Sequence, residues 1–399
     1  MSMDKIRLFI TQFLGKLKYK CWFALEWIRE NKRVFLKRLA VIALVLGAFF
    51  WIFLRTYHNY DVTNEIERKS DMAANYHFGE DGTLCYSKDG VSFTNAKGEV
   101  VWNQVFGMES PKMSSCGDYI AVGDIGANSV YVFDHNGLKG KLALEKPIQD
   151  LRISRQGVVA VILEDGSANQ MNLYSKDGQM LVSIKVTIAS GGYPLTMALS
   201  DDGTRLAVSY ILFSGGRIKS KLVFYDFSNK ETSGTPSGSF EYDELIPRLE
   251  FVEDNMVLAC AETGFYTYQC GATVVQNHSQ SFDGEVKSIF ITDNRIGVVT
   301  KNPEVVKEGH TADKYKVQTY RFGGTKAGSF TFDFDYKAVN ASDKAIVFYN
   351  DQECQIYSYR GHQKFQYEFE YKIDGVLPGS ASGEYILLDQ QSVKTITLK

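Results

Sequence analysis

A short aliphatic or β-branched run, followed by a turn and a second run, returns eight times along this chain. The first runs are centred near Cys85, Val122, Val161, Val208, Leu258, Val298, Val347 and Leu387. Neighbouring centres lie 37 to 50 residues apart. A strand-rich repeat of roughly 40 to 50 residues is typical of a β-propeller. The repeat therefore predicts an all-β fold built from a ring of similar sheets.

Each repeat unit contains enough short runs for about one propeller blade of four strands. The first unit predicts strands at residues 76–78, 83–87, 91–94 and 100–106. Asp-Gly and Lys-Gly pairs separate these runs, and glycine supplies the positive φ that tight hairpin turns need. We expect eight blades, with seven as the alternative if the first unit is irregular.

The last unit contains only three predicted strands, so its blade needs a fourth strand from another part of the chain. A propeller commonly completes its last blade with a strand from the other end of the domain, which removes an exposed sheet edge. Residues 58–71 are polar and lack a strong period. We interpret them as a stalk that can also donate the closing strand, and residues 72–399 as the propeller.

Charge is distributed unevenly along the chain. Residues 1–38 hold ten Lys or Arg and three Asp or Glu, a net charge of +7. Because the whole chain carries −3, the remainder carries −10. An acidic domain is a poor match for the phosphate backbone, so we expect no nucleic-acid partner.

An uncharged run from Leu39 to Leu54 follows the basic segment. The run reaches the length of a membrane-spanning helix if Arg55 snorkels and Tyr57 lies at the interface. Residues 39–57 therefore predict a signal anchor whose partner is the lipid bilayer. The positive-inside rule places residues 1–38 in the cytoplasm and the propeller outside the cell membrane. A cleaved signal peptide and a buried core helix are the alternatives.

Within residues 1–38, apolar side chains recur at helical spacing. They are Ile6, Phe9, Ile10, Phe13, Leu14 and Leu17. This pattern predicts a basic amphipathic helix on the inner leaflet, and a docking helix for a cytoplasmic partner is the alternative.

The two longest spacings between repeat centres indicate insertions between the second and third strands of two units. Loops that join second to third strands lie on one rim of a propeller, so both insertions are expected on that rim. They are residues 211–220 and 301–313. Function concentrates in such loops. Phe213 beside Arg217 suits a binding patch, with His310 in the second insertion as a further candidate contact. The alternative is that residues 211–213 simply extend the strand.

No catalytic, cofactor-binding or metal-binding motif stands out in the chain. The six histidines lack ligand spacing, and the six cysteines show neither a zinc pattern nor a disulfide framework. Carboxylates cluster at Asp201-Asp202 and at Asp333 and Asp335, without a signature that singles out a catalytic pair. We therefore expect a protein that is not an enzyme and holds no cofactor.

The segment NAKGEVVW, from Asn95 to Trp102, resembles the turn and outer strand of quinoprotein-dehydrogenase-like propeller repeats. In those repeats a closing Trp docks each blade against its neighbour. SKDGQMLV, ending at Val182, keeps the turn and lacks the Trp. The resemblance therefore extends to the broad superfamily of quinoprotein-like and WD40-like propellers, over residues 72–399. The layout as a whole also resembles uncharacterised single-pass propeller proteins of clostridial Firmicutes.

These features together predict a membrane-anchored, extracytoplasmic propeller that serves as a protein-interaction scaffold. Its expected partner is a protein or a wall polymer of the cell envelope. Two alternatives remain open from the sequence: a hydrolase or lyase of wall polysaccharide, and a single-pass sensor of an external ligand.

Overall fold

The computed structural model describes residues 55–68, 75–78, 82–95, 98–228, 234–253, 255–302 and 313–399, and scattered residues between 32 and 47. The chain divides into two units, Met1–Thr56 and Tyr57–Lys399. In the first unit the described residues from 32 to 47 are helical. No helix among the described residues is both long and apolar enough to cross a membrane. The predicted anchor 39–57 lies largely outside these residues, and the predicted amphipathic helix lies wholly outside them.

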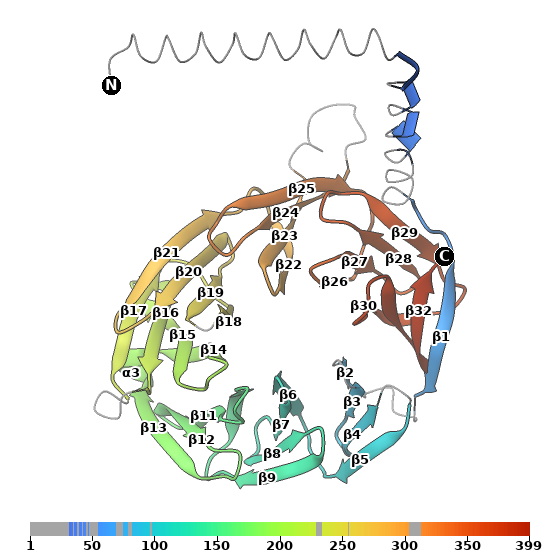
Figure 1. Ribbon diagram of the computed structural model, residues 1–399. Helices are drawn as coiled ribbons and strands as arrows, with labels where there is room; N and C mark the ends of the chain where they lie inside the picture. The colour runs from blue at the N-terminus through green and yellow to red at the C-terminus, as the bar shows by residue number, and fades with distance from the viewer. Residues whose placement is uncertain are drawn as a thin grey trace, which may run out of the picture. The chain divides into compact units, whose positions relative to one another are not determined.

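The second unit is an eight-bladed propeller of four-stranded antiparallel sheets, as Figure 1 shows. The innermost strands are β2 (Asn75–Phe78), β6 (Pro111–Cys116), β10 (Ile148–Ile153), β14 (Tyr193–Leu199), β18 (Arg248–Glu253), β22 (Val286–Thr292), β26 (Ala338–Ala341) and β30 (Ile373–Pro378). The second strands are β3 (Gly82–Tyr86), β7 (Tyr119–Asp124), β11 (Val159–Asp165), β15 (Arg205–Ser214), β19 (Met256–Cys260), β23 (Arg295–Lys301), β27 (Ile346–Tyr349) and β31 (Glu384–Asp389).

The third and the outermost strands complete each blade. A single turn of helix, α3 (Ile188–Gly191), follows the outermost strand of the third blade. The third strands are β4 (Gly90–Asn95), β8 (Ser129–Asp134), β12 (Ala168–Tyr174), β16 (Arg217–Asp226), β20 (Gly264–Cys270), β24 (Tyr315–Tyr320), β28 (Glu353–Tyr357) and β32 (Ser392–Leu398). The outermost strands are β5 (Val100–Val105), β9 (Gly137–Ala143), β13 (Met180–Thr187), β17 (Pro236–Tyr242), β21 (Val274–Ser281), β25 (Lys326–Phe332), β29 (Gln363–Glu368) and β1 (Tyr60–Glu67). Blades 1 to 8 follow this order.

Strand β1 closes the ring as the outermost strand of blade 8. It pairs with β32 from Tyr60 opposite Leu398 to Glu67 opposite Ser392. Blade 8 therefore combines one strand that precedes blade 1 in the sequence with three strands that follow blade 7. The ladder satisfies the main-chain groups of β32, which would otherwise form a free sheet edge.

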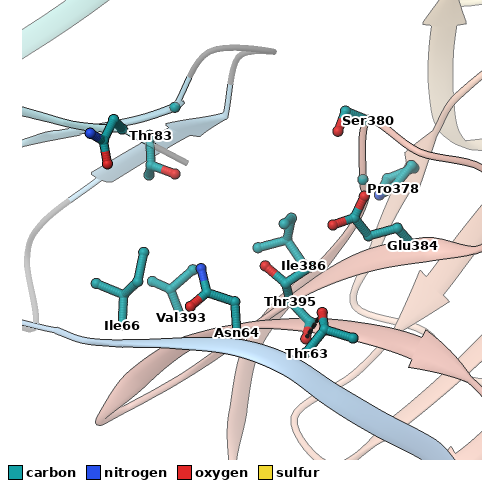
Figure 2. Close-up of a pocket in the computed structure, with 13 residues that line it drawn as sticks. Thr63, Asn64, Ile66, Thr83, Pro378, Ser380, Glu384, Ile386, Val393 and Thr395 are labelled. Carbon is teal, nitrogen blue, oxygen red and sulfur yellow. Dashed lines mark hydrogen bonds between the residues drawn. The ribbon is translucent and has the colours of Figure 1, made fainter. Parts of the chain in front are cut away.

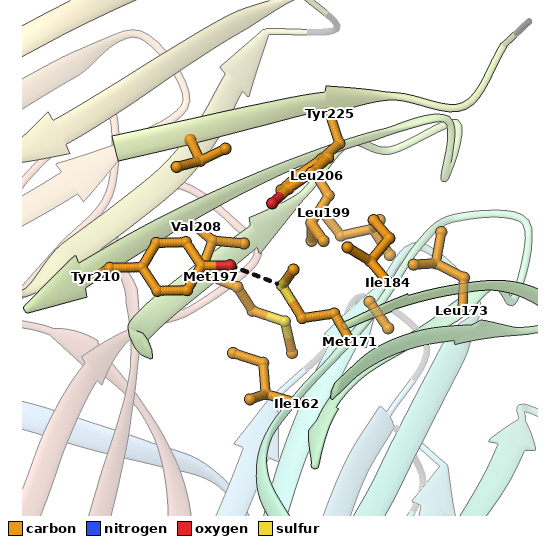
Figure 3. Packing of buried hydrophobic residues seen from close by; sticks show 12 residues of the cluster. Ile162, Met171, Leu173, Ile184, Met197, Leu199, Leu206, Val208, Tyr210 and Tyr225 are labelled. Atoms are coloured by element: carbon orange, nitrogen blue, oxygen red, sulfur yellow. Dashed lines mark hydrogen bonds between the residues drawn. The ribbon is translucent and has the colours of Figure 1, made fainter. Parts of the chain in front are cut away.

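Seven hydrophobic clusters form the core of the propeller, and each lies between two neighbouring blades. The cluster between blades 3 and 4, shown in Figure 3, packs Ile162 and Met171 against Val208 and Tyr210. The Tyr210 hydroxyl lies 3.2 Å from the Met171 sulfur. Most second strands are buried on both faces because a blade covers each side, as in β11 and β19. This double burial produces the continuous apolar runs of the repeat.

Trp102 docks blade 1 against blade 2 in the way that the resemblance implies. Its indole nitrogen donates a hydrogen bond of 3.1 Å to the carbonyl oxygen of His135. Its ring stacks on Phe133 with a centroid separation of 5.1 Å. Aromatic pairs of this kind contribute roughly 0.5–1.5 kcal/mol beyond the free energy gained from burying their surface.

Candidate functional site

The first predicted insertion is not a loop but an extension of the hairpin β15–β16. Both strands have 10 residues, whereas the second strands of the other blades have seven or fewer. Gly215 and Gly216 form the turn with φ of 60° and 74°. Two consecutive positive φ angles define a type I′ turn, which suits the twist of a tight hairpin. The alternative that residues 211–213 extend the strand is therefore correct.

The tip of this hairpin stands free of the rest of blade 4. Strand β14 pairs with β15 only as far as Ile211, and β17 pairs with β16 only as far as Ser220. Residues 212–219 therefore form a two-stranded ribbon without a neighbouring strand on either edge. Loops joining second to third strands lie on one rim of the disc, and this ribbon extends that rim.

Successive side chains of the ribbon point to opposite faces, and the two faces differ in character. Phe213 pairs with Ile218 on one face, and their side chains are 72% and 49% exposed. Tyr193 pairs with Ile211 on the same face and is 50% exposed. We call Tyr193, Phe213 and Ile218 the hairpin patch. All three side chains are large, apolar and at least half or nearly half exposed.

The opposite face of the ribbon is basic. Arg217 is exposed and lies opposite Ser214 in the register. Lys219 points to this same face, and its ammonium lies 2.7 Å from a carboxylate oxygen of Asp243. This hydrogen bond lowers the pKa of Asp243 below its ordinary value. Phe213 and Arg217 thus share the tip but lie on opposite faces, which the sequence did not reveal.

The second predicted insertion joins β23 to β24 on the same rim. His310 lies outside the described residues, so its role as a contact remains a prediction. At the end of this insertion, the ammonium of Lys314 lies 2.7 Å from Asp335 and 3.7 Å from Asp333. Both carboxylates of the cluster considered in the sequence therefore contact the same lysine.

The other carboxylate cluster organises a hairpin turn. Asp202 accepts hydrogen bonds from the Ser200 hydroxyl at 2.6 Å and the Thr204 hydroxyl at 2.8 Å. Burial works against the charge, but these bonds hold the pKa of Asp202 below its ordinary value. Asp201 pairs with Arg155 at 2.9 Å. Within the described part of the chain, no three His, Cys, Asp or Glu side chains gather as metal ligands.

A cavity lies between blades 8 and 1, an interface that we call the seam. None of the seven hydrophobic clusters of described residues spans the seam. Instead, the seam holds a cavity of about 370 Å³. Its lining residues, drawn in Figure 2, include Asn64, Glu384 and Thr395 from blade 8 and Thr83 from blade 1. A smaller cavity of about 130 Å³ lies between Ile66 and the threonines and serine of β3 and β4.

Arg68, directly after β1, ties the two sides of the seam together. Its guanidinium donates hydrogen bonds to the Asp374 carboxylate and to the main-chain carbonyl of Asp389, both in blade 8. The same group lies 5.1 Å from the centre of the Tyr76 ring in blade 1. Only 8% of the Arg68 side chain is exposed. Burial opposes the charge, yet the bond to Asp374 raises the pKa of Arg68.

Burial also shifts the pKa values of the titratable groups beside Arg68. It raises the pKa of the Tyr76 hydroxyl and of the Cys85 thiol, so both are neutral at physiological pH. All five cysteines among the described residues are free thiols. Neutral, shielded thiols are poor nucleophiles, and Cys85 is therefore a packing residue of the seam.

The architecture is that of an eight-bladed β-propeller with four-stranded blades. It is similar to the crystal structure of BamB from Moraxella catarrhalis, with a TM-score of 0.51 and 12% identity over 85% of this chain and 100% of that one. It is also similar to the Dos1 propeller, with a TM-score of 0.53 and 12% identity over 87% and 96% of the two chains. At such identity these likenesses show the fold alone.

The particular family is defined by the sequence itself. The chain belongs to a family of unknown function, DUF5711, whose sequence profile matches residues 53–398. The sequence matches no curated protein. The match covers the whole propeller, including the closing strand β1.

Proposed function

We propose that this protein is an interaction scaffold of the cell envelope that holds a partner protein on the hairpin patch. The observation that carries the proposal is the free ribbon with Phe213 at its tip, 72% exposed. A side chain of this size costs solvation free energy in water and gains it when a partner covers it. Aromatic and Arg side chains also dominate the energetics of protein interfaces.

The chemistry of the ribbon specifies the complementary surface. The apolar face of Phe213 and Ile218 fits an apolar depression, and the basic face with Arg217 fits carboxylates at its border. The candidate acids of the chain, Asp202 and Asp335, serve turns and ion pairs. These arrangements support a binding function rather than hydrolysis.

The envelope location rests on the charge and hydropathy of the N-terminal unit. In this proposal, residues 39–57 anchor the chain in the cell membrane, residues 1–38 lie in the cytoplasm, and the propeller lies outside. The segment of sixteen uncharged residues and the net charge of +7 before it support this topology. The resemblance to single-pass propeller proteins of clostridial Firmicutes supports the same layout.

Photo-crosslinking tests the hairpin patch directly. A photoreactive residue in place of Phe213 or Ile218, in the full chain in cells, is expected to yield one and the same discrete adduct. The matched control is Val105, which is 76% exposed on the outer strand β5 and far from the ribbon in the sequence. The scaffold proposal fails if positions 213 and 218 give no adduct, or the same adducts as position 105.

A charge in the uncharged run tests the anchor. Leu46→Arg places a guanidinium near the middle of the predicted span, which costs about 2.5–3.5 kcal/mol for membrane insertion. We expect the variant chain to appear in the carbonate-soluble fraction, whereas the natural chain requires detergent. Phe213→Arg serves as the control and should stay with the membranes. Equal extraction of the natural chain and the Leu46 variant would contradict the anchor.

A further inference from the structure

The two faces of blade 1 differ in chemistry. Toward blade 2 it presents Leu84, Val91 and Phe93, which are buried in a hydrophobic cluster. Residues between them in the same strands point to the other face, and these include Thr83, Cys85, Ser92 and Thr94, which line the seam. A sheet covered on both faces normally carries apolar residues on both. This face is therefore suited to a polar occupant.

Polar groups in the larger seam cavity are available for a ligand. The side chains of Asn64, Thr83 and Thr395 make no hydrogen bond with any described residue, and all three are partly shielded from solvent. Figure 2 shows Thr83 facing Asn64 and Thr395 across the cavity. Two hydroxyls and an amide thus converge from two blades, and each can both donate and accept a hydrogen bond.

Other lining residues narrow the class of ligand. Among the described lining residues there is no Lys or Arg, which argues against a phosphate or carboxylate ligand. The one carboxylate, Glu384, already accepts a hydrogen bond of 3.1 Å from the main-chain nitrogen of Ala381. Ile66, Ile386 and Val393 add apolar surface to the same wall.

Strands β3, β31 and β32, which wall the cavity, are each paired on both edges, whereas β1 is paired only with β32. The polar groups that the cavity offers to a ligand on these strands are therefore side chains of Asn64, Thr83 and Thr395.

We propose that the seam cavity binds a neutral sugar residue. A sugar ring carries hydroxyls around its rim, which suit Asn64, Thr83 and Thr395, and C–H groups on its faces, which suit the isoleucines and valine. A volume of about 370 Å³ lies at the lower end of the range for ligand cavities. The site is independent of the hairpin patch on blade 4.

Binding of defined sugars to the detergent-purified full chain tests the site. The probes are N-acetylglucosamine, its tetramer and maltotetraose, titrated calorimetrically. Thr395→Val and Thr83→Val remove a hydroxyl while keeping the shape of the side chain. Each should weaken binding roughly three- to tenfold, because one hydrogen bond is lost. The matched control is Thr325→Val, an exposed threonine in a turn of blade 6.

Each outcome decides for or against the proposal. Binding of a tetramer in preference to the monosaccharide identifies a segment of a polymer, and equal binding identifies a free sugar. Either result supports the site if the two seam variants weaken binding and the Thr325 variant does not. The proposal is overturned if none of the probes binds, or if the seam variants bind as well as the natural chain. Thermal unfolding of each variant shows that the propeller remains folded, and photo-crosslinking at Phe213 reports separately on the hairpin patch.

Discussion

Phe348→Ala should lower the free energy of unfolding of the propeller by about 3 to 5 kcal/mol. The Phe348 side chain is fully buried between blades 6 and 7. Its ring centre lies 4.4 Å from that of Phe332 and 5.0 Å from that of Tyr336. Truncation removes these contacts and leaves a cavity that neighbouring sheets cannot close. Urea unfolding of the full chain, followed by near-ultraviolet circular dichroism, measures the change.

Phe213→Ala is the matched control for this variant. The same group is deleted, but Phe213 is 72% exposed, so the free energy of unfolding should change by less than about 0.5 kcal/mol. The same variant should nonetheless lose the crosslinked partner. Comparable destabilisation by the two changes would show that Phe213 is part of the core, and would contradict its role in binding.

Arg68→Ala should destabilise the closed ring by about 2 to 3 kcal/mol. Removal of the guanidinium leaves Asp374 and the Asp389 carbonyl without their donor and Tyr76 without its cation. Losing one member of a shielded ion pair costs several kcal/mol, and we reduce that figure because the Asp374 side chain is 38% exposed. Hydrogen exchange should increase most in β1 and β2, which flank the seam.

Arg155→Ala provides the comparison, because Arg155 also pairs with an aspartate, at 2.9 Å. Both partners of that pair are exposed, so we expect no measurable change in the urea midpoint. If the Arg68 variant has the same urea midpoint as the natural chain and the same hydrogen exchange in β1, the contacts of Arg68 do not stabilise the seam.

The blade repeat is visible in the sequence because most second strands are buried on both faces. Val161 and Leu258 lie in such strands and stand within continuous apolar runs. The innermost strands β6 and β10 were missed for the opposite reason. β6 contains Lys112 and Ser114, and β10 contains Asp150 and Arg152, so their polar sequences lack a strand-like apolar signal.

The candidate sites were harder to predict because they depend on pairs distant in sequence. Phe213 and Arg217 were identified from composition, but the turn at Gly215 and Gly216 places them on opposite faces. The seam joins Asn64 and Thr83 to Thr395, and no local pattern relates those positions. A signal did exist: Thr83, Ser92 and Thr94 interrupt the apolar runs of blade 1 where a covered strand would carry valine or leucine.

Pairing between β1 and β32 also sets when the ring can close during synthesis. Lys399 follows Asp61 by 338 residues, and the two side chains meet at 3.2 Å in the folded protein. At a translation rate of roughly 5–20 residues per second, β1 waits about 17 to 68 s for its partner strand to be made. Seven blades can stack during that interval, while the free edge of β1 remains open to other strands. The synthesis of β32 thus decides whether the disc closes on itself or joins another chain.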